Sequence, residues 1–253
     1  MRIKAVIAYD GSAFYGFQSQ TTTPRTVSGA LSRAAAKLGI HAPFVGSGRT
    51  DRGVHATGQV IHVDLPVHWQ NDLPKLRVML NRLLKPHIHV KHVTPVAPDF
   101  HARFDARRRL YRYVLKRTEP TPFEMPYCLH VPDLDPVKVA EALKLFEGTH
   151  DFALFHKKGS DPGSTVRTIR RADVTSWRGY TLLYLEADGF LRSQVRMITA
   201  AAFAHMRGEL SLGQISEQLE GRRQHITLLA EPQGLYLARV LYPHSLFGKE
   251  KLQ

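Results

Sequence analysis

Residues 46–55 read GSGRTDRGVH, and this stretch constrains the fold more than any other. Its three glycines permit tight or left-handed backbone, and Arg49, Asp51 and Arg52 place charge within the same ten residues. The apolar residues of 61–65 then alternate with polar ones, which is the pattern of a half-buried strand. The stretch is therefore predicted to be a tight, charged loop next to a strand.

Outward from this loop, the first half of the chain alternates between strand and helix patterns. Strands are predicted at 2–9, 61–65 and 88–96, and helices at 26–39 and 73–83. The turn residues Asp10-Gly11-Ser12 end the first strand, and Gly39 ends the first helix. These elements give an α+β domain.

A second series of elements follows the basic run 107–109. Strands are predicted at 109–117, 166–174, 181–186 and 235–242, and helices from Asp135-Pro136 onward, at 190–206 and at 211–219. The chain is therefore predicted to hold two α+β domains, residues 1–105 and 106–243, each with an antiparallel sheet, followed by a tail at 244–253.

The charge of the chain indicates a polyanionic partner. Lys and Arg number 35 against 22 Asp and Glu, a formal net charge of +13 over 253 residues. Nucleic acid fits this charge first and an anionic membrane second, while a generally basic, soluble surface is the plainer alternative. The apolar run at the N-terminus is too short for a signal peptide, and no stretch approaches a membrane span. With one cysteine, Cys128, the sequence predicts a cytoplasmic protein without membrane association.

Asp51 is the candidate for the chemistry. Because Arg49 and Arg52 flank it, its carboxylate should stay ionised at neutral pH, which suits a nucleophile better than a general acid. The alternative is a turn aspartate that makes only local hydrogen bonds. A phosphate-binding loop is not supported, since the Walker and dinucleotide spacings are both absent.

Two further groups suit RNA. Tyr111 and Tyr113 alternate with arginines in residues 107–113, so that cations could meet phosphates while an aromatic ring stacks on a base. Arg196, expected on the helix at 190–206, could pair with an aspartate bidentately. The alternatives are a core face for the tyrosines, above all for Tyr113, and solvated surface arginines.

The 14 histidines raise the question of a metal. The spacings of His87, His89 and His92 could supply ligands, with His55 and His62 on another strand. No CxxC or HExxH pattern accompanies them. We therefore expect neither a metal nor a cofactor, and a metal-dependent RNA hydrolase remains a rival hypothesis.

A series of ordered motifs resembles the signatures of the tRNA pseudouridine synthase A family. They are found at residues 9–20, 48–59, 100–104, 109–113, 148–152, 189–196 and 234–237. The resemblance thus covers nearly the whole chain. It implies conversion of uridine to pseudouridine at positions 38, 39 and 40 in the anticodon stem-loop of tRNA, without metal or cofactor, by a homodimer. It also implies two ferredoxin-like domains whose sheets form a continuous core around a central RNA-binding cleft.

The resemblance also implies roles for single residues. Asp51 matches the nucleophile, Tyr111 the residue that stacks on the target base, and Arg196 the partner of Asp51. Arg49 is expected to shape the loop and contact RNA, and Leu237 in the last motif is expected at the substrate. A non-catalytic tRNA-binding protein on the same fold is the alternative, although binding alone needs no carboxylate beside a polyanion.

The chain departs from the family pattern away from these residues. Phe17 stands where tryptophan is usual, Ser193-Gln194 replace His-Met, Thr199-Ala200 replace Val-Gly, and Glu231 replaces a small residue. These departures concern details of RNA contact and leave the implied reaction unchanged.

Overall fold

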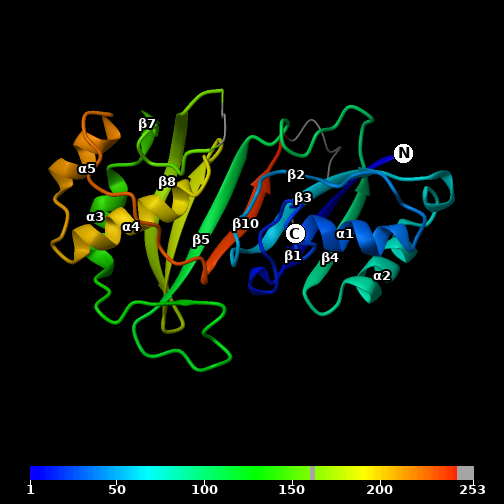
Figure 1. The fold of residues 1–253 in the computed structure, drawn as a ribbon, viewed down its shortest axis with the longest axis horizontal. Helices are drawn as coiled ribbons and strands as arrows, with labels where there is room; N and C mark the ends of the chain where they lie inside the picture. The colour runs from blue at the N-terminus through cyan, green and yellow to red at the C-terminus, as the bar shows by residue number, and fades with distance from the viewer. Residues whose placement is uncertain (160–162, 244–253) are drawn as a thin grey trace. The chain divides into compact units, whose positions relative to one another are not determined.

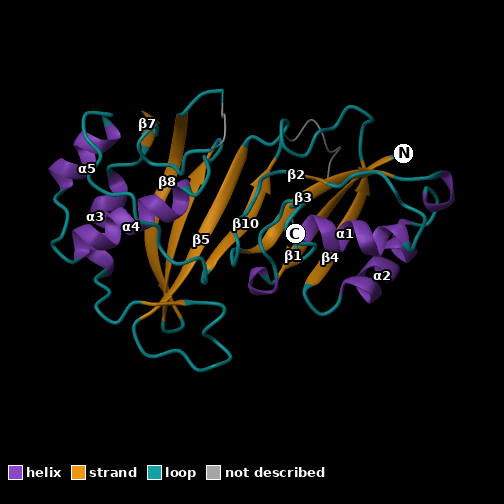
Figure 2. Cartoon of the chain, viewed as in Figure 1, coloured by secondary structure: helices purple, strands orange, loops and turns teal. Residues whose placement is uncertain are grey.

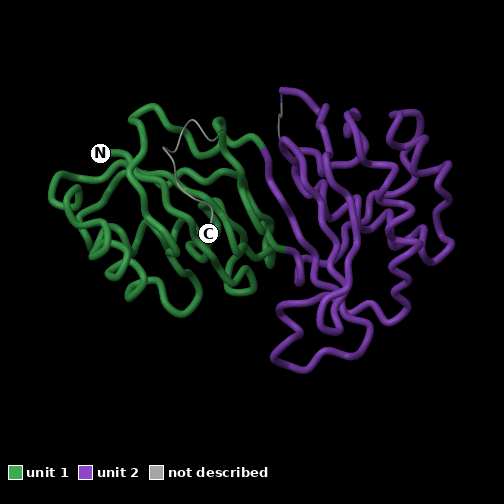
Figure 3. The backbone as a smooth tube through the Cα atoms, turned by 180° about the vertical axis from the view of Figure 1, so that it is seen from behind, with its two compact units in different colours: residues 1–107, 236–253 green, residues 108–235 purple. Residues whose placement is uncertain are grey.

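The computed structural model describes residues 1–159 and 163–243, which form two compact units (Figure 3). The first unit comprises Met1–Arg107 and the described residues from Tyr236 onward, and the second comprises Arg108–Leu235. The domain boundary that the sequence predicts at residue 105 lies close to Arg107, where the chain passes from the first unit to the second. The last strand, which the sequence assigned to the second domain, pairs within the first unit, and the predicted tail lies outside the described residues.

The first unit contains a sheet in the order β4–β1–β3–β10 (Figures 1 and 2). Its strands are β1 (Arg2–Tyr9), β3 (His55–Asp64), β4 (Ile88–Pro95) and β10 (Leu235–Leu241), with the short β2 (Val45–Gly46) paired to β3. β1 runs antiparallel to both of its neighbours. β10 joins β3 in parallel, with Tyr236 opposite His55.

Two helices, α1 (Val27–Ala36) and α2 (Leu73–Leu84), lie over this sheet (Figure 1). Both begin at capping residues: Thr26 accepts from the amide of Gly29, and Asp72 from that of Lys75. The alternate residues of β1 that the sequence placed on one face are buried, namely Ile3, Ala5, Ile7 and Tyr9. The core of the first unit therefore includes the side chains of β1 that immediately precede the turn at Asp10.

The second unit contains a sheet in the order β5–β9–β8–β7. Its strands are β5 (Arg108–Lys116), β6 (Leu129–His130), β7 (Gly148–Asp151), β8 (Val166–Trp177) and β9 (Tyr180–Ala187). Pairing is antiparallel along this path, and β6 adds a parallel pair to β5. The helices are α3 (Pro136–Lys144), α4 (Gln194–Met206) and α5 (Leu212–Leu219). The phenylalanines at 146, 152 and 155 are fully buried in this unit.

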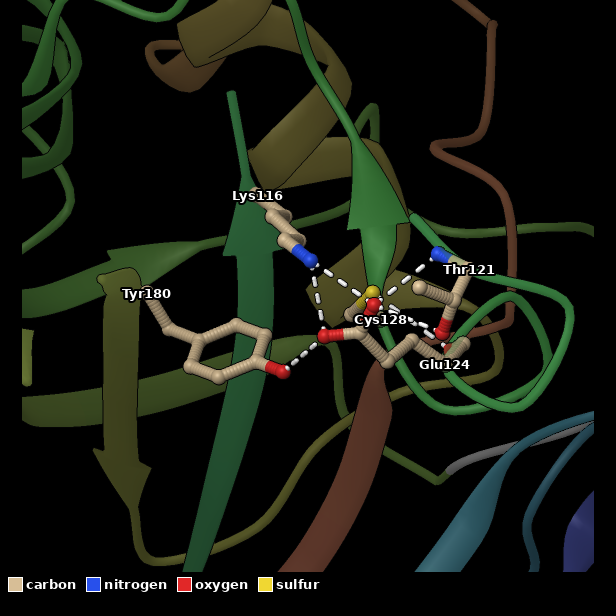
Figure 4. A network of polar contacts seen from close by, with 5 residues as sticks. All are labelled: Lys116, Thr121, Glu124, Cys128 and Tyr180. Carbon is tan, nitrogen blue, oxygen red and sulfur yellow. Dashed lines mark hydrogen bonds and ion pairs between the residues drawn. The ribbon is translucent and has the colours of Figure 1, made fainter. Parts of the chain in front are cut away.

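A clasp of polar contacts holds the long connection between β5 and β6 (Figure 4). The carboxylate of Glu124 accepts from Lys116 Nζ at 2.7 and 2.8 Å and from the Tyr180 hydroxyl at 2.5 Å. It also accepts from the amide and hydroxyl of Thr121 at 2.9 and 2.8 Å. The Lys116 ammonium and these donors hold the pKa of Glu124 far below its usual range. The connection is thereby fixed to the ends of β5 and β9.

The α+β class is confirmed, and so are the predicted starts of α3 and α5. Asp135 caps α3, and Ser211 and Gln214 form a capping box at α5. α4 begins later than predicted, because Ser193 adopts a left-handed φ of 57°. Arg192 therefore precedes the helix and does not share a helical face with Arg196.

Among the described residues, no helix is both long enough and apolar enough to cross a membrane. Most neighbouring strands in both sheets pair antiparallel, as expected. Two pairs are parallel: β10 with β3, and β6 with β5. The expected continuous core and central RNA-binding cleft concern both units together and remain predictions.

Candidate active site

Asp51 lies in the loop between β2 and β3, where the sequence placed it. Its side chain is partly exposed, and the neighbouring Arg49 and Arg52 are exposed. The amide of Val54 donates to the carbonyl of Asp51 at 3.2 Å, and Gly53 takes a φ of 80° that closes the turn. Asp51 is thus a partly exposed residue of a tight turn, between two exposed arginines in the sequence.

The segment that follows β1 packs against the backbone of this loop. The amide of Phe17 donates to the carbonyl of Thr50 at 3.1 Å. Gly16 has a φ of 109°, and a Cβ there would lie 3.0 Å from the same carbonyl oxygen. Gly11 approaches still more closely, since a Cβ would lie 2.1 Å from the carbonyl oxygen of Val54. Both glycines are therefore required by close contact with the Asp51 loop.

Buried polar side chains lie beneath the loop. The Tyr9 hydroxyl and Thr50 Oγ1 are 2.8 Å apart. Gln59 on β3 accepts from Ser47 Oγ at 2.6 Å and donates to the carbonyl of Gly48 at 2.8 Å. The exposed fractions of Tyr9, Ser47, Thr50 and Gln59 are 4%, 1%, 7% and 0%. Three of the four residues at 47–50 are therefore held by hydrogen bonds from outside the loop.

His55, the first residue of β3, connects the end of the Asp51 loop to the turn that follows β1. Its Nδ1 accepts from the amide of Gly11 at 3.0 Å and lies 3.4 Å from a carboxylate oxygen of Asp10. Its ring stacks on Tyr236 of β10, with centroids 4.8 Å apart. His55 is fully buried and is structural in this arrangement.

Leu237 belongs to the first unit together with Arg49 and Asp51. It lies on β10 opposite Ala56 of β3, and its side chain is fully buried. It thus packs beside the strand that begins four residues after Asp51. Its contact with substrate stays a prediction.

Tyr111 lies in the second unit, on β5. It pairs with Leu185 of β9, and its ring meets that of Phe190 edge-on, with centroids 5.2 Å apart. Tyr111 is partly exposed, whereas Tyr113 is 0% exposed and donates its hydroxyl to the carbonyl of Glu231 at 3.1 Å. The two tyrosines therefore differ: Tyr113 belongs to the core, and Tyr111 keeps part of its ring accessible.

Arg196 also lies in the second unit, in the first turn of α4. Its Nε donates to the carbonyl of Ala230 at 2.8 Å, and the Ala230 amide donates back to the Arg196 carbonyl at 3.1 Å. The arginine is partly buried and fixed to the connection before β10. The residues expected from the sequence thus come from both units: Arg49, Asp51 and Leu237 from the first, Tyr111 and Arg196 from the second.

Within the described ranges, no group of three or more His, Cys, Asp or Glu side chains could hold a metal ion. His62, one of the histidines considered as a ligand, is buried and accepts from the amide of Ala102 at 3.0 Å. Its burial, helped by the charge of Arg2, lowers its pKa to about 4.

Sequence reasoning missed the roles of Tyr9, Thr50 and Gln59. All three lie inside motifs that the sequence singled out, at residues 9–20 and 48–59. Their convergence on one loop depends on the pairing of β1 with β3, which no local pattern specifies. A buried tyrosine hydroxyl at the end of an apolar strand was the available signal, because such a group needs a partner.

Comparisons with known proteins agree with these motifs. A family model described as tRNA pseudouridine synthase matches residues 5–105 and 142–243. The tRNA pseudouridine synthase A of Helicobacter hepaticus is 42% identical over 244 residues, which cover 94% of this chain and 98% of the relative. That of Wolinella succinogenes is 41% identical over 243 residues, covering 96% and 95%. That of a Geobacillus species is 39% identical over 246 residues, covering 95% and 98%.

The α+β units and the arginine-flanked aspartate loop, taken with these matches, define an RNA-modifying isomerase. The chain belongs to the tRNA pseudouridine synthase family.

Proposed function

We propose that this enzyme converts uridine to pseudouridine at positions 38, 39 and 40 of the tRNA anticodon stem-loop, with Asp51 as the nucleophile. Family membership supports tRNA as the substrate and uridine isomerisation as the reaction. The three positions come from the resemblance of the motifs. The observation that carries the role of Asp51 is the position of this partly exposed residue in a loop whose backbone is hydrogen-bonded on both sides of it.

The reaction conserves every atom of the nucleotide. The bond from ribose C1′ to N1 of uracil breaks, the base turns, and C1′ joins C5, while C5 loses a proton and N1 gains one. No electrons are exchanged with another molecule and no water is consumed. An ionised carboxylate can serve by attacking the ribose, by attacking the pyrimidine ring or by acting as a base at the sugar.

Tyr111 and Arg196 complete the proposed site. A base in a helical stem must be extruded, which costs a few kcal/mol, and one aromatic stack returns about 1–3 kcal/mol. Tyr111 is an aromatic residue that is partly exposed, as such a stack needs. The remaining free energy would come from contacts between phosphates and the basic surface. Arg196 would pair with the carboxylate of Asp51.

Arg49 is proposed to contact RNA beside Asp51, and Leu237 to contribute an apolar contact to the substrate. We further infer a homodimer and a cytoplasmic location, both from the resemblance. Sedimentation of the purified protein tests the dimer, and fractionation of cells tests the location.

Mapping of pseudouridine in bulk tRNA tests the proposed function. Cells that lack the protein are compared with cells that carry the wild type or Asp51→Ala. The wild type should restore pseudouridine at positions 38, 39 and 40, and Asp51→Ala should restore none. Modification at other positions alone would contradict the proposed sites, and full modification by Asp51→Ala would contradict the nucleophile.

The same experiment distinguishes the proposed synthase from a non-catalytic tRNA-binding protein. That alternative predicts tRNA affinity without any product from the wild type. Full activity in excess chelator would in turn eliminate a metal-dependent reaction.

A further inference from the structure

We propose that the hydrogen bond between Tyr9 and Thr50, supported by Gln59, positions Asp51 for catalysis. Tyr9 and Gln59 are positioning residues in this proposal, because they act through the loop and do not touch the substrate. The inference rests on the proposed role of Asp51 and adds which residues fix its place.

The first support is the convergence of the contacts. The Tyr9 hydroxyl reaches Thr50 Oγ1 at 2.8 Å, one residue before Asp51. The carbonyl of Thr50 accepts from the Phe17 amide at 3.1 Å, and the carbonyl of Asp51 accepts from the Val54 amide at 3.2 Å. The peptide groups on both sides of the Asp51 Cα are therefore each held by a backbone hydrogen bond.

Gln59 provides the second support, at the start of the loop. Its Oε1 accepts from Ser47 Oγ at 2.6 Å and from the Val60 amide at 3.2 Å, and its Nε2 donates to the carbonyl of Gly48 at 2.8 Å. One side chain thus satisfies polar groups of the loop and of its own strand. The loop is held at residues 47, 48 and 50.

The third support is the burial of the polar side chains of Tyr9 and Gln59. Tyr9 and Gln59 lie on the paired strands β1 and β3, where an apolar side chain would fill the core without a need for partners. Burial raises the pKa of the Tyr9 hydroxyl well above its ordinary value, so the hydroxyl keeps its proton. The polar groups point to the backbone and side chains of one loop. Satisfied buried networks of this kind specify a single conformation.

The expected consequence concerns turnover more than binding. A misplacement of about 1 Å at a catalytic group can lower the rate by about 10²-fold. Most of the affinity for tRNA is expected from phosphate contacts spread over the basic surface, and the buried Tyr9–Thr50 pair makes none of these contacts. Loss of the pair should therefore slow the reaction while tRNA affinity is kept.

The test compares Tyr9→Phe, Thr50→Val, their double variant and Thr50→Ser. The single-turnover rate of pseudouridine formation, the Kd for tRNA and the melting temperature are measured for each. Each of the two singles should lower the rate by about 10- to 100-fold with an unchanged Kd. Thr50→Ser keeps the hydroxyl and should stay near the wild-type rate.

The double variant separates positioning from a merely structural role. In the double variant neither hydroxyl of the pair is left buried without the other, so the melting temperature should recover toward the wild type. The rate should remain as low as in the singles, because both single variants break the same hydrogen bond between Tyr9 and Thr50. A rate that recovers with the melting temperature, a rate loss that multiplies in the double, or singles with the wild-type rate would each overturn the proposal.

Asp51→Ala in the same assay keeps the two proposals apart. An active Asp51→Ala would contradict the proposed function itself. An inactive Asp51→Ala beside singles with the wild-type rate would overturn only the positioning role of Tyr9 and Thr50.

Discussion

At the scale of single residues, the flanking charges of Asp51 were readable from the sequence, and its surroundings were not. The Arg-Thr-Asp-Arg order indicated an ionised carboxylate, and the structure adds that Thr50 is buried while its neighbours on either side reach solvent. The side chain of Thr50 is hydrogen-bonded to that of Tyr9, which is 41 residues away. Contacts at such separation follow from strand pairing and have no local sequence pattern.

Tyr111 and Tyr113 make a matched pair for the proposed base stack. Tyr111→Ala should lower the rate of pseudouridine formation by roughly 5- to 150-fold, the equivalent of one lost stack of about 1–3 kcal/mol, and Tyr111→Phe should keep most of the rate. Kinetic assays on an anticodon-arm substrate measure both. Equal losses in the two variants would implicate the hydroxyl instead.

Tyr113→Phe is the control on the same face of the strand. It removes the hydrogen bond to the Glu231 carbonyl and should reduce the free energy of unfolding by about 1 kcal/mol, with little change in rate. Denaturant unfolding gives the stability. A rate loss larger than that of Tyr111→Phe would exchange the roles of the two tyrosines.

At the scale of elements, apolar periodicity predicted most strands and helices, whereas backbone exceptions set their ends. The helix expected from residue 190 starts at Gln194, because Ser193 is left-handed and the Gln194 side chain accepts from the Leu191 amide at 2.7 Å. The short strands β2 and β6 span two residues each and were not predicted. Two residues are too few to show any alternation.

The Glu124 clasp should make stability depend on acid pH. The folded-state pKa of Glu124 is lowered, so its contribution is complete above the unfolded pKa of glutamate, near ~4.3, and is lost as pH falls through the folded pKa. The melting temperature of the wild type should exceed that of Glu124→Gln at pH 7. The difference should shrink below pH 4, and a difference that is equal at pH 7 and pH 3 would contradict the clasp.

At the scale of the whole molecule, the charge of +13 was the earliest pointer to RNA, and its role is electrostatic attraction. The order of the elements predicted two domains. The return of the chain to the first unit at Tyr236 could not be predicted in this way, because the parallel pairing of β10 with β3 joins residues about 180 positions apart. Sequence patterns describe neighbours along the chain and do not specify such pairings.

Affinity for tRNA should fall steeply with salt. A protein that neutralises 6–10 phosphates loses roughly 10³–10⁵ in affinity between 50 and 200 mM salt. Filter binding over this range gives the slope for wild type and for Asp51→Ala. The two slopes should agree, because the carboxylate releases no counterions from the RNA, and a flat dependence would contradict a binding surface made of basic residues.

The most direct test of the central claim is the single-turnover reaction of purified Asp51→Asn with a tRNA that the wild type modifies. The substitution keeps the size of the side chain and removes its charge. The account predicts that the variant binds this tRNA as tightly as the wild type and forms no pseudouridine. Formation of pseudouridine at the wild-type rate by Asp51→Asn would contradict it.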